Sequence, residues 1–261
     1  MMKNSDIFYF DVDGTLLDTK SHTFLDSTIY SLKKLKEKGY RVALCTGRTL
    51  DAIQSIGIPD FIEWDGFVLA NGALVLDRNL DVIFRKALSP EWVSKLISLH
   101  KGTLLLEGDE IMMVNKPNET FLLSMKHFNI DPNFPETNYT NQVVYKVLSY
   151  GFNDLRQEDV DWILEDADFV YDIIKNREIS PKNINKFLGV QALNNHLNTN
   201  ISTGFGDGDN DVEFLEGVTF GVAMGNGTEG VKKVSDYETD PSWDDGIYKA
   251  LVKFGVIEEE L

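Results

Sequence analysis

The first third of the chain alternates short apolar runs with amphipathic segments. Residues 7–10 form an apolar run that predicts a strand buried on both faces, and residues 24–39 place apolar side chains at close to helical spacing. The runs at 40–45 and 66–70 predict two more strands, with a helix over 48–57 between them. Strands and helices that alternate in this way indicate βαβ units and a parallel sheet.

The pattern changes at about residue 88 and returns to α/β alternation after about residue 181. The segments in between are typical of an α+β unit with an antiparallel sheet. Helices are expected over 89–101, 118–128 and 154–166, two strands joined by a Gly-Asp turn over 103–115, and further strands over 143–151 and 168–175. The predicted fold class is therefore a parallel-sheet α/β core of residues 1–87 and 182–261, interrupted by an inserted α+β domain of residues 88–181.

Composition and charge narrow the range of partners. The 261 residues carry a formal net charge of −17, which disfavours nonspecific binding to nucleic acid or anionic lipid, because both need a positive surface. The single cysteine, Cys45, allows no disulfide within one chain and favours a reducing compartment. No apolar stretch reaches the roughly 20 residues of a membrane-spanning helix, and no signal-peptide pattern follows the first residues. We therefore expect a cytoplasmic protein without a nucleic-acid or membrane partner, of unknown oligomeric state.

Two carboxylates stand directly after the first predicted strand. Asp11 and Asp13 are separated only by Val12, so both side chains start on the same side of the chain. They lie at the carboxyl end of a parallel strand, where open α/β sheets place their ligands. Unpaired, the two charges would repel each other and resist desolvation, so the pair predicts a cation beside it.

A second acidic cluster follows the strand predicted at 201–207. Asp207, Asp209 and Asp211 come directly after it, with Asn210 among them. The spacing is not that of a calcium-binding EF-hand loop, because Val218 stands where the twelfth-position glutamate would be. Two clusters of hard oxygen ligands at two strand ends can share one Mg²⁺, which would supply the missing cation.

An anion site and a further cation complete the candidate chemistry. Thr46, Gly47 and Arg48 follow the strand at 40–45 and are expected to open a helix, where backbone N–H groups bind phosphate and Gly47 allows close approach. Lys186 lies on the helix predicted at 183–197, and from the residues alone Lys182 is an equally good candidate.

In this order, the motifs resemble those of the haloacid dehalogenase (HAD) superfamily. They are DxDGT at 11–15, TGR at 46–48, Lys186 and GDGxND at 206–211. The strings ANGA at 70–73, GVAMGNG at 221–227 and DDGIYKAL at 244–251 are more narrowly similar to the Cof-type sugar-phosphate phosphatases of HAD subclass IIB. The resemblance implies a Rossmann-like core, a cap domain inserted between the second and third motifs, and a Mg²⁺-dependent phosphatase of small phosphorylated metabolites.

The resemblance also implies roles for individual residues. Asp11 corresponds to the nucleophile that becomes an aspartyl-phosphate, and Asp13 to the general acid and base. Lys186 corresponds to the lysine that neutralises the nucleophile and the phosphoryl group, although Phe187 stands where the family has a glycine. The implied Mg²⁺ ligands are Asp11, the backbone carbonyl of Asp13, Asp207 and Asp211, and the implied phosphate contacts are Thr46, Gly47, Lys186 and Asn210.

Two other functions remain open at this stage. A phosphotransferase or phosphomutase would use the same residues, with a second hydroxyl in place of water. A receiver-like phosphorylation switch also combines an acidic pair, a phosphoacceptor aspartate and a lysine, but it needs neither a general acid such as Asp13 nor a long insertion. The substrate is not encoded in any motif, and the loops at 106–112 and 173–180 of the insertion are the first candidates to contact it.

Overall fold

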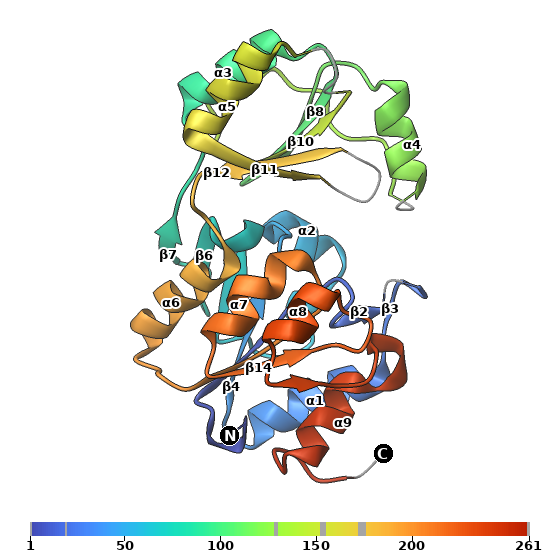
Figure 1. Cartoon of the computed structure of the whole chain (residues 1–261), viewed down its shortest axis with the longest axis vertical. Coiled ribbons are helices and arrows are strands. Elements are labelled where there is room, and N and C mark those ends of the chain that lie inside the picture. Colours follow the sequence, from blue (N-terminus) through green and yellow to red (C-terminus); the bar gives the residue numbers. More distant parts are fainter. Residues whose placement is uncertain (1, 19, 128–129, 152–154, 172–175, 260–261) are drawn as a thin grey trace. The chain divides into compact units, whose positions relative to one another are not determined.

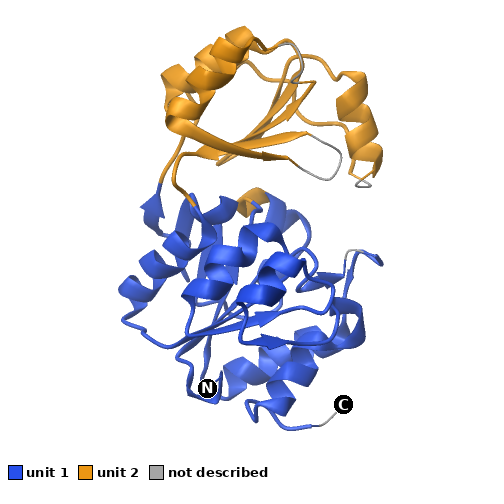
Figure 2. Ribbon diagram, in the orientation of Figure 1, with its two compact units in different colours: residues 1–48, 52–85, 185–261 blue, residues 49–51, 86–184 orange. Residues whose placement is uncertain are grey.

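A computed structural model describes residues 2–18, 20–127, 130–151, 155–171 and 176–259. The chain divides into two compact units, which Figure 2 colours separately. The core unit comprises residues 1–48, 52–85 and 185–261, and the inserted unit comprises residues 49–51 and 86–184. The predicted α/β fold class is confirmed, because a mostly parallel sheet with helices on it makes up the core unit.

An eight-stranded sheet in the order β15-β14-β13-β1-β4-β5-β6-β7 organises the core unit. Neighbouring strands from β15 to β5 are parallel, and the hairpin of β6 and β7 extends the sheet with antiparallel strands. The short β1 is central and fully buried, as its apolar run predicted. The strands are β1 Ile7–Phe10, β4 Arg41–Cys45, β5 Gly66–Leu69, β6 Leu74–Asp77, β7 Val82–Arg85, β13 Ser202–Gly206, β14 Phe220–Ala223 and β15 Tyr237–Glu238.

Helices cover both faces of this sheet (Figure 1). One face carries α6 (Lys186–Leu197), α7 (Val212–Gly217) and α8 (Glu229–Val234), and the other carries α1 (Asp26–Glu37) and α9 (Gly246–Lys253), which contact each other. Gly39 ends α1 as its position predicted, with a φ of 84° and an N–H that donates to the oxygen of Lys36. The remaining short elements are α2 Leu50–Ser55, β2 Leu17–Asp18, β3 Thr23–Phe24, and single 3₁₀ turns at Met2–Asn4, Ile58–Asp60, Ala70–Gly72, Asp209–Asp211 and Ser242–Asp244.

The inserted unit is built on a five-stranded antiparallel sheet in the order β11-β12-β10-β8-β9. Two helices, α3 and α5, pack on one face, and α4 packs on the other. Ser89 caps α3 by accepting a hydrogen bond from the N–H of Trp92 at 3.2 Å. The elements are α3 Pro90–Leu99, β8 Thr103–Gly108, β9 Ile111–Val114, α4 Glu119–His127, β10 Val144–Tyr150, α5 Gln157–Asp166, β11 Ala167–Tyr171 and β12 Arg177–Pro181.

Three local expectations need correction or restriction. The helix expected from residue 48 begins only at Leu50, so the TGR residues lie in the loop between β4 and α2. The segment 173–180, expected as a loop, contains strand β12, which pairs with β10 and β11. The expected strand 168–175 ends at Tyr171 as β11, and residues 172–175 lie outside the described part of the chain. In the described ranges, no helix is long and apolar enough to cross a membrane.

Candidate active site

The candidate residues gather at the carboxyl ends of the central parallel strands. Asp11 follows β1, Asp207 follows β13 and Thr46 follows β4, and these three strands are neighbours in the sheet. The carboxyl ends of parallel strands lie at the same edge of a sheet, which brings together residues that are almost 200 positions apart in sequence.

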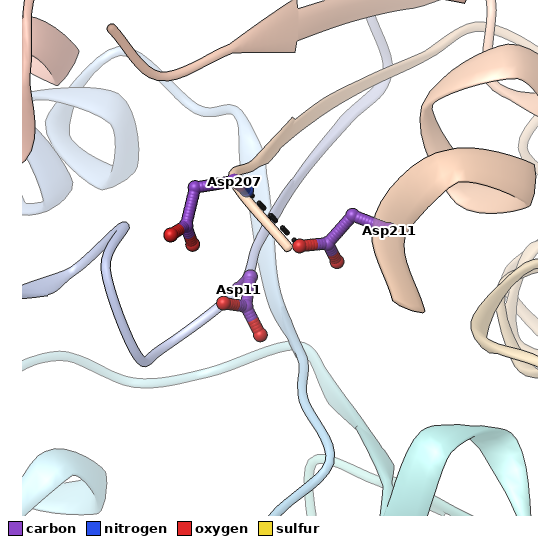
Figure 3. A group of neighbouring side chains, drawn as sticks. All are labelled: Asp11, Asp207 and Asp211. Carbon is purple, nitrogen blue, oxygen red and sulfur yellow. Dashed lines mark hydrogen bonds between the residues drawn. The ribbon is translucent and has the colours of Figure 1, made fainter. Parts of the chain in front are cut away.

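Three carboxylates form the centre of this site (Figure 3). One oxygen each of Asp11, Asp207 and Asp211 lies within 4.8 Å of the others. Asp211 is fully buried, and its Oδ2 accepts hydrogen bonds from the backbone N–H groups of Asp207 and Gly208, both at 3.0 Å. The turn 207–211 thus holds its own last carboxylate in place beside Asp11.

Lys186 supplies the cation of this cluster. Its Nζ donates to Oδ1 of Asp11 and to Oδ1 of Asp211, both at 2.6 Å, and its side chain is fully buried. Lys186 is the first residue of α6, and the side chain of Asn185 caps that helix. The alternative, Lys182, instead donates to the backbone oxygen of Leu164 within the inserted unit, so the geometry distinguishes the two lysines that the sequence could not.

The charges of the cluster strongly affect one another. Burial raises the pKa of Asp11 well above the usual carboxyl range; Lys186 opposes this, and Asp211 and Asp207 add to it. Burial raises the pKa of Asp207 to about 7, and the nearby charge of Asp211 contributes. Burial disfavours the ammonium of Lys186, but the charges of Asp11 and Asp211 outweigh it, so the pKa of Lys186 rises. The ammonium of Lys186 is therefore held in its charged form. Its single positive charge does not balance the three neighbouring carboxylates.

Two neutral donors orient Asp207. Its Oδ1 accepts from the hydroxyl of Thr15 at 3.2 Å, and its Oδ2 accepts from Nδ2 of Asn226 at 3.2 Å. Asn226 Nδ2 also donates to the backbone oxygen of Gly14 at 2.8 Å. Gly14 has a φ of 84°, and a Cβ there would lie 2.1 Å from the Asp207 carboxylate, so only glycine fits this approach.

A divalent cation fits this donor set. The group offers three carboxylates and one ammonium, and Lys186 contacts two of the carboxylates but not Asp207. Hard oxygen ligands of this kind match Mg²⁺, and excess negative charge in a buried cluster needs such an ion. Asp11, Asp207 and Asp211 are the side chains that would hold it.

The side chain of Asp13 is not part of this group. It is 46% exposed and forms a two-pronged ion pair with Arg48, whose Nε and Nη2 donate to its two carboxylate oxygens at 2.8 and 2.7 Å. This pairing of Asp13 was not anticipated from the sequence, which placed Arg48 at the start of a helix. The geometry therefore separates Asp13, beside the cluster, from the buried carboxylates within it.

The expected phosphate cradle lies next to the cluster. Thr46 is buried, and its Oγ1 accepts from the N–H of Arg48 at 3.1 Å, which closes the loop around Gly47. Asn210 is exposed, and its Nδ2 donates to Oδ1 of Asn71 at 3.0 Å. Within this loop the N–H of Thr46 donates to the backbone oxygen of Val68 at 2.9 Å and the N–H of Arg48 donates to Oγ1 of Thr46, so the hydroxyl of Thr46, and not these two N–H groups, is the donor that an anion can meet.

Four residues with clear contacts at the site had no assigned role from sequence reasoning. Arg48, Asn71 and Asn226 each stand inside a quoted motif, TGR, ANGA or GVAMGNG, but a motif string does not say which side chain a residue contacts. Thr15 is the last residue of the DxDGT motif, and the motif does not say what its hydroxyl contacts. The available signal was the presence of amide and guanidinium groups at the ends of predicted strands.

Known proteins resemble this chain over nearly its full length. The sequence profile of the haloacid dehalogenase-like hydrolases matches residues 8–251. The 5-amino-6-(5-phospho-D-ribitylamino)uracil phosphatase YcsE of Bacillus subtilis is 27% identical over 253 residues, which cover 92% of this chain and 92% of that protein.

Solved structures agree with this match. A protein from Geobacillus kaustophilus has a TM-score of 0.87 at 28% identity, over 97% of this chain and 100% of that chain. A sugar phosphatase of HAD subclass IIB has a TM-score of 0.78 at 25% identity, again over 97% and 100% of the two chains. The resemblance predicted from the motifs is confirmed: the chain belongs to the haloacid dehalogenase-like hydrolases and is a phosphatase of that family.

Proposed function

We propose that the protein is a Mg²⁺-dependent phosphatase that hydrolyses a small phosphorylated metabolite, a sugar or polyol phosphate, through an aspartyl-phosphate on Asp11. The observation that carries this proposal is the placement of Asp11. In the described residues its hydrogen bonds end on Oδ1, which Lys186 holds, so Oδ2 is the oxygen available to attack. The carboxylate is therefore oriented by one oxygen and reactive at the other.

The reaction follows from the residues around Asp11. Oδ2 of Asp11 attacks the phosphorus, and the bond between phosphorus and the ester oxygen breaks. Asp13 gives a proton to the departing oxygen and then takes one from the water that hydrolyses the aspartyl-phosphate, which releases inorganic phosphate. Lys186 keeps its charge beside Asp11 throughout, and the hydroxyl of Thr46 and the amide of Asn210 donate to the phosphoryl oxygens. Mg²⁺, when bound, neutralises negative charge on the phosphoryl group.

Asp13 has to exchange partners during this cycle. Both of its carboxylate oxygens accept hydrogen bonds from Arg48, so an oxygen has to be released before Asp13 can exchange a proton with the leaving group or with water. Protonation of the leaving group requires the protonated form, so part of the Arg48 pairing must be released in the first step. We propose that Arg48 positions Asp13 for the second step.

The inserted unit is proposed to act as the cap that selects the substrate. The family resemblance supports this role, since the insertion begins and ends between the second and third motifs at residues 86–184. Exchanging this segment with that of a relative of different substrate preference should transfer the preference. An unchanged ranking of substrates in a folded exchange variant would contradict the cap role.

The substrate class rests on the relatives. One is a phosphatase of a phosphorylated ribityl compound and another is a sugar phosphatase, and both substrates carry a phosphate ester on a polyhydroxylated carbon chain. The buried free thiol of Cys45 fits a reducing compartment, and we propose a cytoplasmic enzyme.

A screen of phosphorylated metabolites with Mg²⁺ tests the proposed function. We expect release of inorganic phosphate from sugar or polyol phosphates, with a phosphoenzyme that turns over within seconds. An isomeric sugar phosphate as the product would instead identify a mutase, and a phosphoenzyme that persists for minutes would identify a switch. Absence of phosphate release from every phosphate monoester tested, with Mg²⁺ bound, would overturn the proposal.

A further inference from the structure

The turn at Ala70–Gly72 has an unusual backbone. Three successive residues have positive φ angles, 48° at Ala70, 54° at Asn71 and 93° at Gly72. Residues other than glycine rarely adopt this region, and each costs free energy that the surrounding contacts must offset. The turn follows β5, the strand next to β4, so it lies at the same sheet edge as the catalytic cluster.

Backbone contacts tie this turn to the phosphate cradle. The N–H of Asn71 donates to the oxygen of Thr46 at 3.0 Å, and the N–H of Ala70 donates to the oxygen of Arg48 at 2.9 Å. The amide of Asn71 lies against Gly47, since a Cβ at Gly47 would be 3.0 Å from Oδ1 of Asn71. The left-handed turn thus holds both ends of the 46–48 loop and places an amide beside its middle residue.

The opposite side of the turn faces the helix that carries Lys186. A Cβ at Gly72 would lie 2.2 Å from the backbone oxygen of Asn185, and a Cβ at Gly189 would lie 3.0 Å from the Cα of Gly72. Two glycines are therefore needed for α6 to begin this close to the turn. Residues 70–72 therefore contact both the 46–48 loop and the N-terminus of α6, the helix that begins with Lys186.

The side chain of Asn71 then determines how Asn210 is oriented. An asparagine amide has an oxygen that only accepts and a nitrogen with two N–H donors. Because Oδ1 of Asn71 accepts one N–H of Asn210 at 3.0 Å, Asn210 presents its nitrogen, not its oxygen, to this part of the site. In the described contacts of Asn210 this is the only bond that Nδ2 makes, so its second N–H is left for an anion.

We propose that Asn71 is a positioning residue for the phosphoryl group, which acts by fixing the amide of Asn210 with its N–H donor directed at the anion. This inference rests on the proposed function and deepens it. The left-handed backbone is the condition for the contact, because it allows the same residue to bond Thr46 through its backbone and Asn210 through its side chain. Asn71 itself need not touch the phosphate.

Glycine is the substitution that isolates the amide from the backbone. Asn71→Gly keeps the positive φ accessible and removes only the side chain. Asn198→Gly is the matched control, since Asn198 caps the far end of α6 with a φ of 52° and is also a left-handed asparagine. Asn210→Ala and the double variant with Asn71→Gly complete a double-mutant cycle.

The readout is the affinity of the Mg²⁺-loaded protein for inorganic phosphate, measured by calorimetry and as competitive inhibition. We expect Asn71→Gly to weaken phosphate binding by about 3- to 10-fold and Asn210→Ala by about 10-fold. The double variant should be no weaker than Asn210→Ala alone, because Asn71 acts through Asn210. In turnover, the loss for Asn71→Gly should fall on KM, with kcat within about 3-fold of the unmodified enzyme.

Three results would overturn this inference. The first is an unchanged phosphate affinity in Asn71→Gly, and the second is a double variant whose losses multiply. A melting temperature that falls much further for Asn71→Gly than for Asn198→Gly would identify a purely structural role and also overturn it. The binding measurement needs no turnover, so a protein that binds phosphate but hydrolyses no ester would count against the proposed function alone.

Discussion

Each of the two units contains a lysine held between two carboxylates, and the two clusters differ in geometry and in their place in the sheet. In the core unit, Lys186 lies 2.6 Å from both Asp11 and Asp211, and the three side chains are 0%, 7% and 0% exposed. In the inserted unit, Lys146 lies 2.9 Å from Glu107 and 3.7 Å from Glu178.

The positions of these residues in their sheets explain the difference. Lys146 and Glu107 are direct cross-strand partners in the middle of β10 and β8, a pairing that stabilises an antiparallel sheet. The core cluster lies beyond the ends of parallel strands, and a third carboxylate, Asp207, joins it without a cationic partner among the described contacts. The same side-chain types therefore stabilise a sheet in one unit and, in the other, leave an excess of negative charge where a ligand can bind.

Removing the proposed nucleophile should give the largest effect and separate the two clusters most clearly. Asp11→Asn should lower turnover by at least about 10⁴-fold, because an amide cannot form the phosphoenzyme. Phosphate release from an aryl phosphate and from sugar phosphates would be measured. The matched control is Glu107→Gln, which removes a carboxylate from the lysine of the other cluster and should change aryl-phosphate turnover less than about 3-fold. Substantial residual activity in Asp11→Asn would rule out the covalent route.

The two lysines provide a second contrast. Lys186→Met should reduce turnover by about 10³-fold, since it removes the charge beside the nucleophile, and should cost about 3–5 kcal/mol of unfolding free energy by leaving buried carboxylates unpaired. Lys146→Met should lower stability with little effect on aryl-phosphate turnover. Denaturant unfolding and kinetics on both variants would check this. Comparable catalytic losses in the two variants would show that the clusters are not functionally distinct.

The side chain of Asp13 lies next to the buried cluster and not in it, so its proposed role as a general acid can be tested separately from metal binding. Asp13→Asn should slow the hydrolysis of alkyl phosphates by about 10²- to 10³-fold but leave metal binding intact. The loss should shrink for aryl phosphates when phosphorylation limits the rate, because a good leaving group needs no proton. Equal losses across leaving groups under those conditions would argue against an acid role.

The smallest expected effect is the change in melting temperature that Mg²⁺ causes, and we expect it to depend on the core cluster alone. Between the ordinary value of 3.8 and the raised pKa of about 7, the native Asp207 binds more protons than the unfolded chain, so its contribution to stability falls as pH rises through this window. Mg²⁺ should therefore raise the melting temperature most above pH 7, by about 3–8 °C at millimolar concentration, and less near pH 5.5.

Variants at the two clusters can identify where this metal effect arises. Asp207→Asn should lose most of the Mg²⁺-dependent increase in melting temperature, and Glu107→Gln should keep it. Calorimetry in the presence and absence of Mg²⁺ would measure both. An increase that survives in Asp207→Asn would place the ion elsewhere.

The sequence predicted the fold class from the alternation of strand and helix patterns. It predicted the residues of the buried cluster from the positions of strand ends, because an acidic residue directly after a buried strand lies at the carboxyl edge of a parallel sheet. The orientation of side chains could not be read in this way. Nothing in the TGR string showed that Arg48 turns toward Asp13, and the three left-handed residues at 70–72 contain only one glycine as a signal. Strand β12 was missed because its hydrogen bonds, not its composition, define it.

The strand order of the core sheet has a consequence for folding of the chain during its synthesis on the ribosome. β4 follows β1 closely in the sequence and can pair with it early in synthesis, but the other edge of β1 pairs with β13, whose residues emerge about two hundred positions later. Until β13 is synthesised, one edge of the apolar β1 has no partner strand. Asp11 also waits for its ion-pair partner Lys186, which lies 175 positions later in the sequence. The inserted unit is synthesised in full during this interval and, as a compact body of neighbouring strands, can fold first. The active site is thus among the last parts of the nascent chain to be completed. A truncated chain that ends before β13 is inactive and exposes an unpaired edge of β1, which can pair with another chain and aggregate.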